Sequence, residues 1–327
     1  MRTLSRRHLV KNLCAAAALP RALHAEGPWP NRPLRVIVPF APGASIDTIA
    51  RILAPKLSAR IGASVIVENR TGAGGILGTA FVASQPADGH TLLFTSNPYV
   101  IAPLLLPANQ KPPYDAGKDL QPIAQVAAAP LIVTVTNDLG VTTLRGLIDK
   151  ARSTPEGVTY GSGGVGTINH LAVEMLSRMA HVEMIHVPYS GLGPAITALL
   201  GGHVQMMAGT FPSVMPMIRE GRARALAVTG PSRSSLVPDL PTVAEAGIPG
   251  YELEAWWGML GPAGMPPQVT ERINAEINAI LGTSEMLELL ARDGSSPRPG
   301  PVSDFEKLIR TEIPRWGQVV RDAKIAI

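Results

Sequence analysis

The feature that most constrains this chain is a repeated unit of apolar segment, glycine-rich turn and amphipathic helix. The first unit joins the apolar segment 34–38 to residues 46–61, where apolar side chains recur at helical spacing. A second strand is expected at 65–67, followed by the glycine-rich turn 72–75 and a helix, and a third strand at 91–94. Such alternation predicts a mostly parallel sheet covered by helices on both faces.

The same succession restarts in the middle of the chain and predicts a second α/β lobe. It begins with a strand at 158–160, the glycine-rich turn 161–166 and a helix at 167–179. Further strands are expected at 183–187, 204–208 and 224–228, and further helices at 195–200, 269–281 and 304–320. The proline- and glycine-rich run 231–250 is expected to return the chain to the first lobe.

We therefore predict an α/β fold of two lobes. Lobe 1 is expected to comprise residues 26–128 and 251–327, and lobe 2 residues 129–250. The chain would then cross between the lobes twice, and two crossings form a hinge about which the lobes close on a ligand.

Charge is concentrated at the amino terminus. Five of the 29 basic residues lie within residues 1–25, which contain no acidic residue, so 24 basic residues accompany 25 acidic ones in the rest of the chain. The sequence pI near 9.4 therefore gives no indication of nucleic-acid or membrane-surface binding. The basic start, the short apolar run 13–19 and the small residues ending near Ala25 predict a signal peptide cleaved there and a periplasmic protein.

The leader also contains an export-pathway motif and the only cysteine of the sequence. Residues 5–11 read Ser-Arg-Arg-His-Leu-Val-Lys, which matches the twin-arginine export pattern. The apolar run is far shorter than the roughly 20 residues that span a bilayer. Because Cys14 lies inside the leader, the mature chain is expected to have no disulfide, cysteine nucleophile or thiolate metal site.

Two turns are candidate anion sites, because each joins a strand to the start of a helix. The first, residues 39–47, offers Gly43 for a tight turn and Ser45 as a helix N-cap. The second is residues 161–167. Unpaired amides and the positive end of the helix dipole favour an anion at both. Either turn could instead serve only to reverse the chain and cap its helix.

Other residue types near strand ends complete the predicted site. Phe40 and Tyr189 are expected to supply apolar contact, and Ser96, Asn97 and Thr210 polar contact. The full predicted ligand-binding set is Phe40, Ala41, Gly43, Ala44, Ser45, Asp47, Ser96, Asn97, Gly161, Ser162, Gly163, Gly164, Thr167, Tyr189 and Thr210.

An exported NAD(P)-type oxidoreductase is the alternative from a different class. Gly161, Gly163 and Gly166 have the spacing of a dinucleotide-binding loop, with Glu183 about 20 residues further on. Glu183 is expected at the start of its strand, however, whereas the ribose-binding acid belongs at the end. No Gly-x-Ser-x-Gly elbow occurs, and His170 lacks the second histidine of a zinc protease helix. His186 is interpreted as a satisfied strand residue, and no metal site is predicted.

Several motifs, in this order, resemble the Bug-type receptors of tripartite tricarboxylate transporters over nearly the whole mature chain. They are VPFAPG at 38–43, VENRTGAGG at 67–75, DGHTLL at 88–93, GSGG at 161–164, HVPY at 186–189, LLGGHV at 199–204, RALAVT at 224–229 and PDLPTVAEAG at 238–247. The resemblance implies a type II periplasmic binding-protein fold, no catalysis and no cofactor. It also implies a small organic carboxylate as ligand, and docking of a monomer on membrane permease subunits.

In similar proteins, backbone groups and bridging waters of the two turns hold the ligand carboxylate. That role carries over to Phe40, Ala41, Gly43, Ser45, Asp47, Gly161, Ser162, Gly163 and Thr167. This chain departs from the family pattern at Ala44, Ile46, Ser190 and Gln205. The changes at Ile46 and Gln205 favour a carboxylate with an apolar or aromatic body over an acidic amino acid. The sequence does not distinguish a transport receptor from a sensory protein that delivers its liganded form to a membrane kinase.

Overall fold

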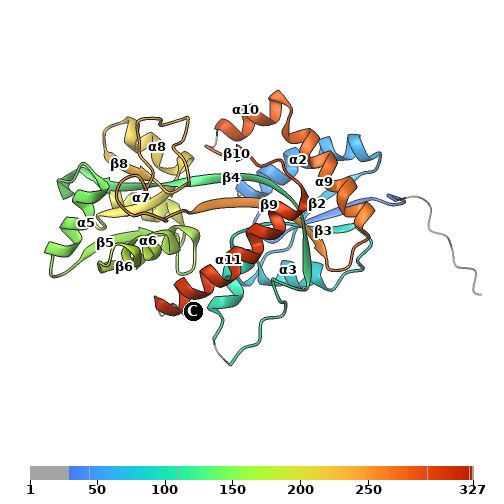
Figure 1. The fold of residues 1–327 in the computed structure, drawn as a ribbon, viewed down its shortest axis with the longest axis horizontal. Coiled ribbons are helices and arrows are strands. Elements are labelled where there is room, and N and C mark those ends of the chain that lie inside the picture. Colours follow the sequence, from blue (N-terminus) through green and yellow to red (C-terminus); the bar gives the residue numbers. More distant parts are fainter. Residues whose placement is uncertain (1–28, 44, 108, 293, 324, 326–327) are drawn as a thin grey trace, which may run out of the picture.

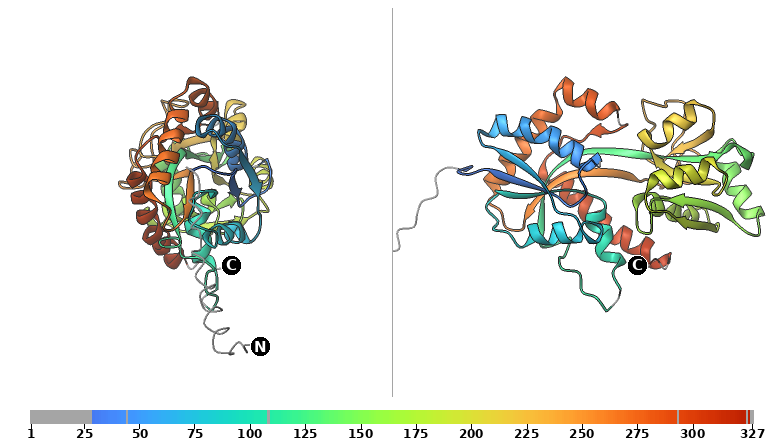
Figure 2. Two further views of the ribbon diagram at one scale, coloured as in Figure 1. Left: turned by 90° about the vertical axis from the view of Figure 1, so that its right-hand side faces the viewer. Right: turned by 180° about the vertical axis from the view of Figure 1, so that it is seen from behind.

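The structure is a computed structural model of the 327-residue chain, and it describes residues 29–43, 45–107, 109–292, 294–323 and 325. The predicted signal peptide 1–25, with Cys14, and the turn residue Ala44 lie outside the described residues. Two lobes lie side by side and are joined by long strands (Figures 1 and 2). Within the described ranges, no helix combines the length and the apolar character that a membrane span requires.

Lobe 1 is built on three parallel strands. β1 (Leu34–Val38) lies between β2 (Val65–Asn69) and β3 (Thr91–Ser96). The helical elements of this lobe are α2 (Ser45–Ile61), η1 (Ala73–Gly75), α3 (Ile76–Ala83), α4 (Pro98–Ile101), η2 (Ala102–Leu105), α9 (Pro267–Leu281), α10 (Ser284–Arg292) and α11 (Val302–Asp322).

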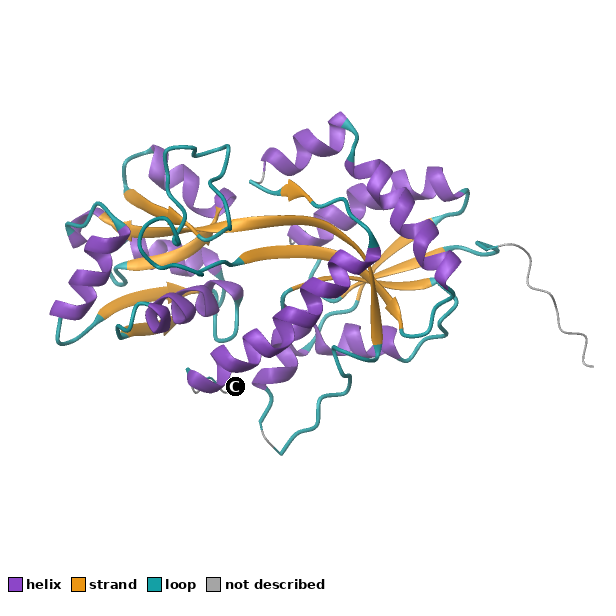
Figure 3. Cartoon of the chain, viewed as in Figure 1, coloured by secondary structure: helices purple, strands orange, loops and turns teal. Residues whose placement is uncertain are grey.

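Helices cover both faces of this sheet, because successive strand residues point to opposite sides. Val36 and Val38 pack in one apolar cluster with α2 and α9, whereas Ile37 packs in another with α3 and α11. The two layers of helices are visible in Figure 3.

Lobe 2 repeats the arrangement. Its sheet contains β5 (Val158–Ser162), β6 (Met184–Pro188), β7 (Met206–Thr210) and β8 (Ala223–Val228). Its helical elements are η3 (Asn137–Leu139), α5 (Leu144–Ser153), α6 (Ile168–Met179), α7 (Leu192–Leu200) and α8 (Phe211–Arg219). β5 pairs in parallel with both β6 and β7.

Two strands carry the chain between the lobes. β4 (Leu120–Thr136) leaves lobe 1 between β9 (Glu254–Pro262) and the short β10 (Ser296–Pro297), and continues into lobe 2 beside β7 and β8. β9 returns antiparallel to β4 (Figure 1). The two predicted crossings, and with them the predicted two-lobed fold class, are confirmed.

The crossing strands themselves were not predicted as strands, although the largely β-branched run Leu131–Thr136 favours one; the composition hides only the middle of β4. β4 contains the run Ala127–Ala129 and then Pro130, which lacks an amide donor. In the sheet, Pro130 pairs with Glu254, the first residue of β9, so it stands at the end of that ladder, where a proline is tolerated. The expected strands of both lobes form, and β2, β3 and β5 run on into the polar or small residues Asn69, Ser96 and Ser162.

The lobes also touch beside the hinge. One apolar cluster contains Leu105 of lobe 1, Trp256 of β9 and Leu171 of lobe 2. Further along, Arg315 Nη2 of α11 lies 3.4 Å from Met175 Sδ of α6. Helix α6 therefore sits against lobe 1.

Candidate functional site

The strand directions place two sheet edges opposite one another. β3 is antiparallel to β9 and β9 is antiparallel to β4, so β1, β2, β3 and β4 all run toward lobe 2. β7 is antiparallel to β4, and β5 and β6 are parallel to β7, so these three run toward lobe 1. The carboxyl ends of both sheets, where ligands bind in open α/β folds, therefore face each other across the hinge.

The register along β4 measures how far apart these edges lie at the hinge. Ser96, the last residue of β3, pairs with Trp257, which pairs with Ala127 of β4. Thr210, the last residue of β7, pairs with Leu131 of β4. Leu131 is four residue steps of extended chain beyond Ala127, which is about 13 Å. A small organic molecule fits such a separation.

The lobe-1 turn, residues 39–47, is held by a buried carboxylate. Asp47 is only 2% exposed, and its Oδ2 accepts a hydrogen bond from the Gly43 amide at 2.9 Å. Arg51 Nε donates to both carboxylate oxygens, and Asn69 Nδ2 donates to Oδ1 at 2.8 Å and to the Phe40 carbonyl at 3.0 Å. Burial alone would raise the pKa of Asp47, but the hydrogen bonds from Arg51, Gly43 and Asn69 together lower it.

This network revises the expected role of Ser45. Ser45 is the first residue of α2 rather than its N-cap, and it is exposed. Asp47 takes the capping role for Gly43, because its side chain points back into the turn, where Arg51 balances its charge and Asn69 donates to its Oδ1. Among the described residues, the amides of Ala41 and Ser45 find no acceptor, so both remain available to a ligand.

In the lobe-2 turn, residues 161–167, two alternate backbone amides are hydrogen-bonded within the protein. The Gly164 amide donates to Ser162 Oγ at 3.1 Å, and the Gly166 amide donates to His170 Nδ1 at 3.0 Å. The amides of Gly163 and Val165, between them, have no acceptor among the described residues. Thr167 caps α6 by accepting from the His170 amide.

Two stacked imidazoles support this turn from inside lobe 2. The rings of His170 and His186 lie 3.8 Å apart and almost parallel, and the ring of Tyr160 lies 4.9 Å from that of His186. His186 Nε2 is 2.6 Å from Ser162 Oγ, and Tyr160 Oη donates to Glu174 Oε1 at 2.6 Å. Burial, helped by His186, lowers the pKa of His170 to about 3, and burial also lowers the pKa of His186. Both rings are therefore uncharged at neutral pH.

The other predicted residues divide between the turns and the hinge. Phe40 lies beside Gly75, and the Tyr189 ring lies beside Gly161, so both aromatic residues stand next to their turns. Ser96 and Thr210 end opposed strands, and Thr210 Oγ1 is bonded to Ser213 Oγ.

Asn97 faces the hinge. It is 1% exposed, donates to the Glu254 carbonyl and accepts from the Trp256 amide. Its amide group would have to break these bonds to reach a ligand, and the hydroxyl of Ser162 is likewise committed to His186 and Gly164.

Two departures from the family pattern do not bear on the ligand. Ile46 is 5% exposed and packs in the core of lobe 1. Gln205 precedes β7, at the edge of lobe 2 away from the turns, and its Oε1 accepts from the Thr159 amide. The preference for an apolar carboxylate that was drawn from these two positions therefore loses its basis.

The sheet of lobe 2 contradicts the alternative of a dinucleotide-binding oxidoreductase. Val158 pairs with Met184 and Ser162 with Pro188 in the parallel ladder of β5 and β6. Glu183 thus lies at the amino end of β6, whereas the turn that begins after Ser162 lies at the carboxyl end. An acid at the wrong edge of the sheet cannot reach a ribose held at the turn.

Three side chains that carry this geometry were missed as site residues: Arg51, Asn69 and His170. Arg51 stands four residues after Asp47 on one helix face, which is a readable signal for an ion pair. Asn69 ends a strand just before a glycine-rich turn, which is also a readable position. The bond from Gly166 to His170 was harder to read: His170 is the third residue of α6, where a side chain can reach back to the amides before the helix, but the residues known for this role are glutamate and glutamine.

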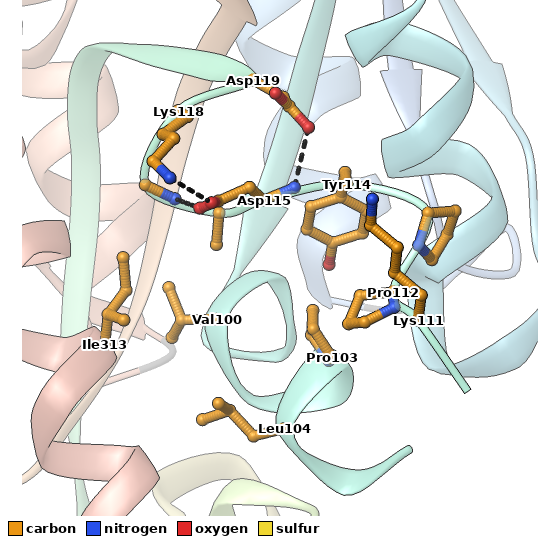
Figure 4. A pocket seen from close by; sticks show the side chains of 13 residues that line it. Val100, Pro103, Leu104, Lys111, Pro112, Tyr114, Asp115, Lys118, Asp119 and Ile313 are labelled. Atoms are coloured by element: carbon orange, nitrogen blue, oxygen red, sulfur yellow. Dashed lines mark hydrogen bonds and ion pairs between the residues drawn. The ribbon is translucent and has the colours of Figure 1, made fainter. Parts of the chain in front are cut away.

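A cavity of about 770 Å³ lies away from both turns, on the flank of lobe 1 (Figure 4). Tyr114, Lys118 and Ile313 line it, and Lys118 is paired with Asp115. The walls come from α4, α11 and the segment before β4, so this cavity does not belong to the opposed edges.

Two α/β lobes, a two-strand hinge and opposed turns whose free amides find no acceptor in the described part of the chain define a solute-binding receptor of the periplasmic type. The family of tripartite tricarboxylate transporter receptors matches residues 49–325, and the chain belongs to it. The predicted family and fold class are confirmed, and a dinucleotide-dependent function finds no support.

Related proteins are similar to this chain over nearly its whole length. BugT of Bordetella pertussis is 36% identical over 296 residues, which cover 90% of this chain and 90% of that protein. Among solved structures, R. palustris Rpa4515 with adipate is 34% identical with a TM-score of 0.76, covering 91% of this chain and 99% of that one. MatC from Rhodopseudomonas palustris with bound malate is 31% identical with a TM-score of 0.73, covering 89% and 100%.

Proposed function

We propose that this protein is an exported periplasmic receptor that binds a small organic carboxylate between its two glycine-rich turns and delivers it to the permease of a tripartite transporter. The proposal includes a twin-arginine leader cleaved near Ala25, a monomeric mature protein and no catalysis. Lobe 1 is residues 26–128 with 251–327, and lobe 2 is residues 129–250.

One observation carries the proposal: on both opposed sheet edges stand amides that have no acceptor among the described residues. Ala41 and Ser45 offer them from lobe 1, and Gly163 and Val165 offer them from lobe 2. A carboxylate that accepts hydrogen bonds from both edges, directly or through water, is held better when the lobes are close. Its binding therefore favours the closed arrangement. The adipate and malate complexes of the similar Rhodopseudomonas proteins support this ligand class.

A thermal-shift screen tests the ligand class. The purified mature protein is heated with adipate, malate, succinate, benzoate and citrate, with glucose and lysine as non-acid controls. A carboxylate at 100 times its dissociation constant stabilises the folded state by about 2.7 kcal/mol, which raises the melting temperature by several degrees. A receptor that responds to none of the acids, or that responds equally to glucose, would contradict the proposal.

A pair of matched variants tests the site. At Gly163 an added Cβ meets the Leu192 amide at 3.4 Å, and φ is ordinary, so Gly163→Val keeps the backbone but covers the unpaired amide. Gly282→Val is the control, since Gly282 is exposed at the end of α9 and its Cβ meets only atoms 3.7 Å away or more. Gly163→Val should abolish the shift and Gly282→Val should retain it. Equal shifts in both would place the ligand elsewhere.

An absorbance and fluorescence scan of the purified protein addresses the oxidoreductase alternative. A receptor carries no dinucleotide, so neither the absorbance nor the fluorescence of one is expected, and a stoichiometric dinucleotide would overturn the proposed function.

A further inference from the structure

In the lobe-2 turn, two alternate backbone amides donate hydrogen bonds to acceptors in the interior of lobe 2. One acceptor is a histidine, and the other is a serine that is itself bonded to a second histidine. Gly166 donates to His170 Nδ1 directly. Gly164 donates to Ser162 Oγ, which lies 2.6 Å from His186 Nε2. The intervening amides of Gly163 and Val165 have no acceptor among the described residues. Fixing the even-numbered amides inward therefore decides which amides face outward.

The turn would not hold this shape by itself. Gly164 and Gly166 have φ values of 125° and 76°, which only glycine adopts readily. A flexible glycine segment samples many conformations and loses more entropy on ordering than any other residue type. Two fixed acceptors beneath the turn remove this freedom before a ligand arrives, and preorganised donors bind more tightly.

The hydrogen bonds specify how His170 is protonated. Its Nδ1 accepts from Gly166, so its proton is on Nε2. Nε2 lies 3.8 Å from Glu174 Oε1, and that oxygen accepts from the Tyr160 hydroxyl. His186 stacks on the open face of the same ring. A proton on Nδ1 would face the Gly166 amide donor to donor, so the turn needs an uncharged His170.

We infer that His170 and His186 are positioning residues for ligand binding: as a stacked, uncharged pair they hold Gly166 and Gly164 inward, so that Gly163 and Val165 present their amides to the ligand anion. The inference rests on the proposed function for its ligand and on the turn geometry for its mechanism.

Two substitutions at His170 separate positioning from packing. In His170→Asn the Oδ1 atom takes the place of Nδ1 and accepts from Gly166, whereas His170→Leu fills the space without an acceptor. With adipate as the first calorimetric probe, and malate as the second, His170→Leu should bind about tenfold more weakly than wild type, the loss expected for one hydrogen bond, and His170→Asn should bind within about threefold. His203→Leu, on the exposed surface of the same lobe, is the control and should bind like wild type.

Amide hydrogen exchange gives a readout that needs no ligand. The Gly166 amide should be protected in wild type and in His170→Asn and should exchange faster in His170→Leu, while the amides of β6 keep their protection in all three. Rescue of both binding and protection by asparagine would support positioning, since a role in packing alone would favour leucine.

Either of two results would overturn the inference: equal Gly166 protection in all variants, or wild-type affinity in His170→Leu. If wild type binds no carboxylate, the proposed function fails. The exchange experiment then still decides whether His170 holds the turn.

Discussion

The side chain of Leu105 in lobe 1 lies directly on the backbone of Gly166 in lobe 2. A Cβ added to Gly166 would be 2.0 Å from Leu105 Cδ1, and Leu105 is only 3% exposed. Gly166 is also the residue whose amide is held by His170. The two lobes therefore meet at a residue of the candidate anion turn, so the shape of that turn and the relative position of the lobes are physically linked.

Gly166→Ala should be destabilising for two separable reasons. The left-handed φ of 76° costs a non-glycine residue about 1–2 kcal/mol, and the clash with Leu105 adds about 1–3 kcal/mol. Gly202→Ala is the matched control, because its φ is 73° and its Cβ meets nothing within 4 Å, so it bears the first cost alone. Denaturant unfolding measures both, and equal losses would show that Leu105 moves aside freely.

A double-mutant cycle with Leu105→Ala isolates the contact. Leu105→Ala alone should cost about 2–5 kcal/mol as a cavity-forming change, but combined with Gly166→Ala the loss should be less than additive. Strict additivity would contradict the interlobe contact.

Asp47→Asn should weaken the lobe-1 turn. An amide at this position loses the charge that pairs with Arg51, so the free energy of unfolding at pH 7 should fall by about 1–3 kcal/mol. The pKa of Asp47 is lowered in the folded state, so its contribution is present above the unfolded pKa near 3.9 and is lost as the pH falls through the folded value. The difference between wild type and variant should therefore narrow below about pH 4. A difference independent of pH would contradict the ion pair.

The lowered pKa of His170 predicts that the free energy of unfolding depends on pH in a different range. Its folded pKa is about 3, against about 6.5 in the unfolded chain, so between these values only the unfolded state takes up the proton. Wild-type stability, measured relative to His170→Asn, should therefore fall as the pH is lowered from 7 to 5, by at most about 1.4 kcal/mol per pH unit. Urea unfolding of both proteins at several pH values provides the comparison, and parallel curves would show that His170 is protonated when folded.

For Glu312 at the hinge, the predicted change of stability with pH has the opposite sign to that for His170. It is 4% exposed and accepts from Trp256 Nε1 at 2.6 Å, and its burial raises its pKa. The folded state therefore favours the protonated acid, and stability should fall as the pH rises through the folded pKa. Glu312→Gln keeps an acceptor for Trp256 and should match or exceed wild-type stability at pH 8. Glu312→Ala leaves the indole donor unpaired and should cost about 1–3 kcal/mol. A glutamine variant as unstable as the alanine variant would show that the charge is needed.

Much of the fold was readable from local patterns. The strand at 34–38 and the helix that follows it form as predicted, because a run of apolar residues and a helical spacing are properties of a short segment. The two lobes follow from repetition of that pattern. The middle of β4, Ala127–Pro130, was not readable, because alanine and proline do not favour strands and the neighbouring strands make this segment extended. The largely β-branched run Leu131–Thr136 and the two tryptophans of β9 do favour strands, and that signal was overlooked.

The sequence by itself determined the α/β architecture, the two lobes, the family and the position of two glycine-rich turns at helix starts. Only the tertiary structure decided how those turns are used. Asp47 and not Ser45 bonds Gly43, and Asn97 faces Glu254 and Trp256 at the hinge. The amides of Gly164 and Gly166 turn inward, while those of Gly163 and Val165 have no acceptor within the described ranges. The physical reason is that a hydrogen bond goes to whichever partner packing brings within reach. Some of these partners are only two or four residues away, but the residues that fix them lie on other elements, such as Asn69 for Asp47, His186 for Ser162 and Glu312 for Asn97.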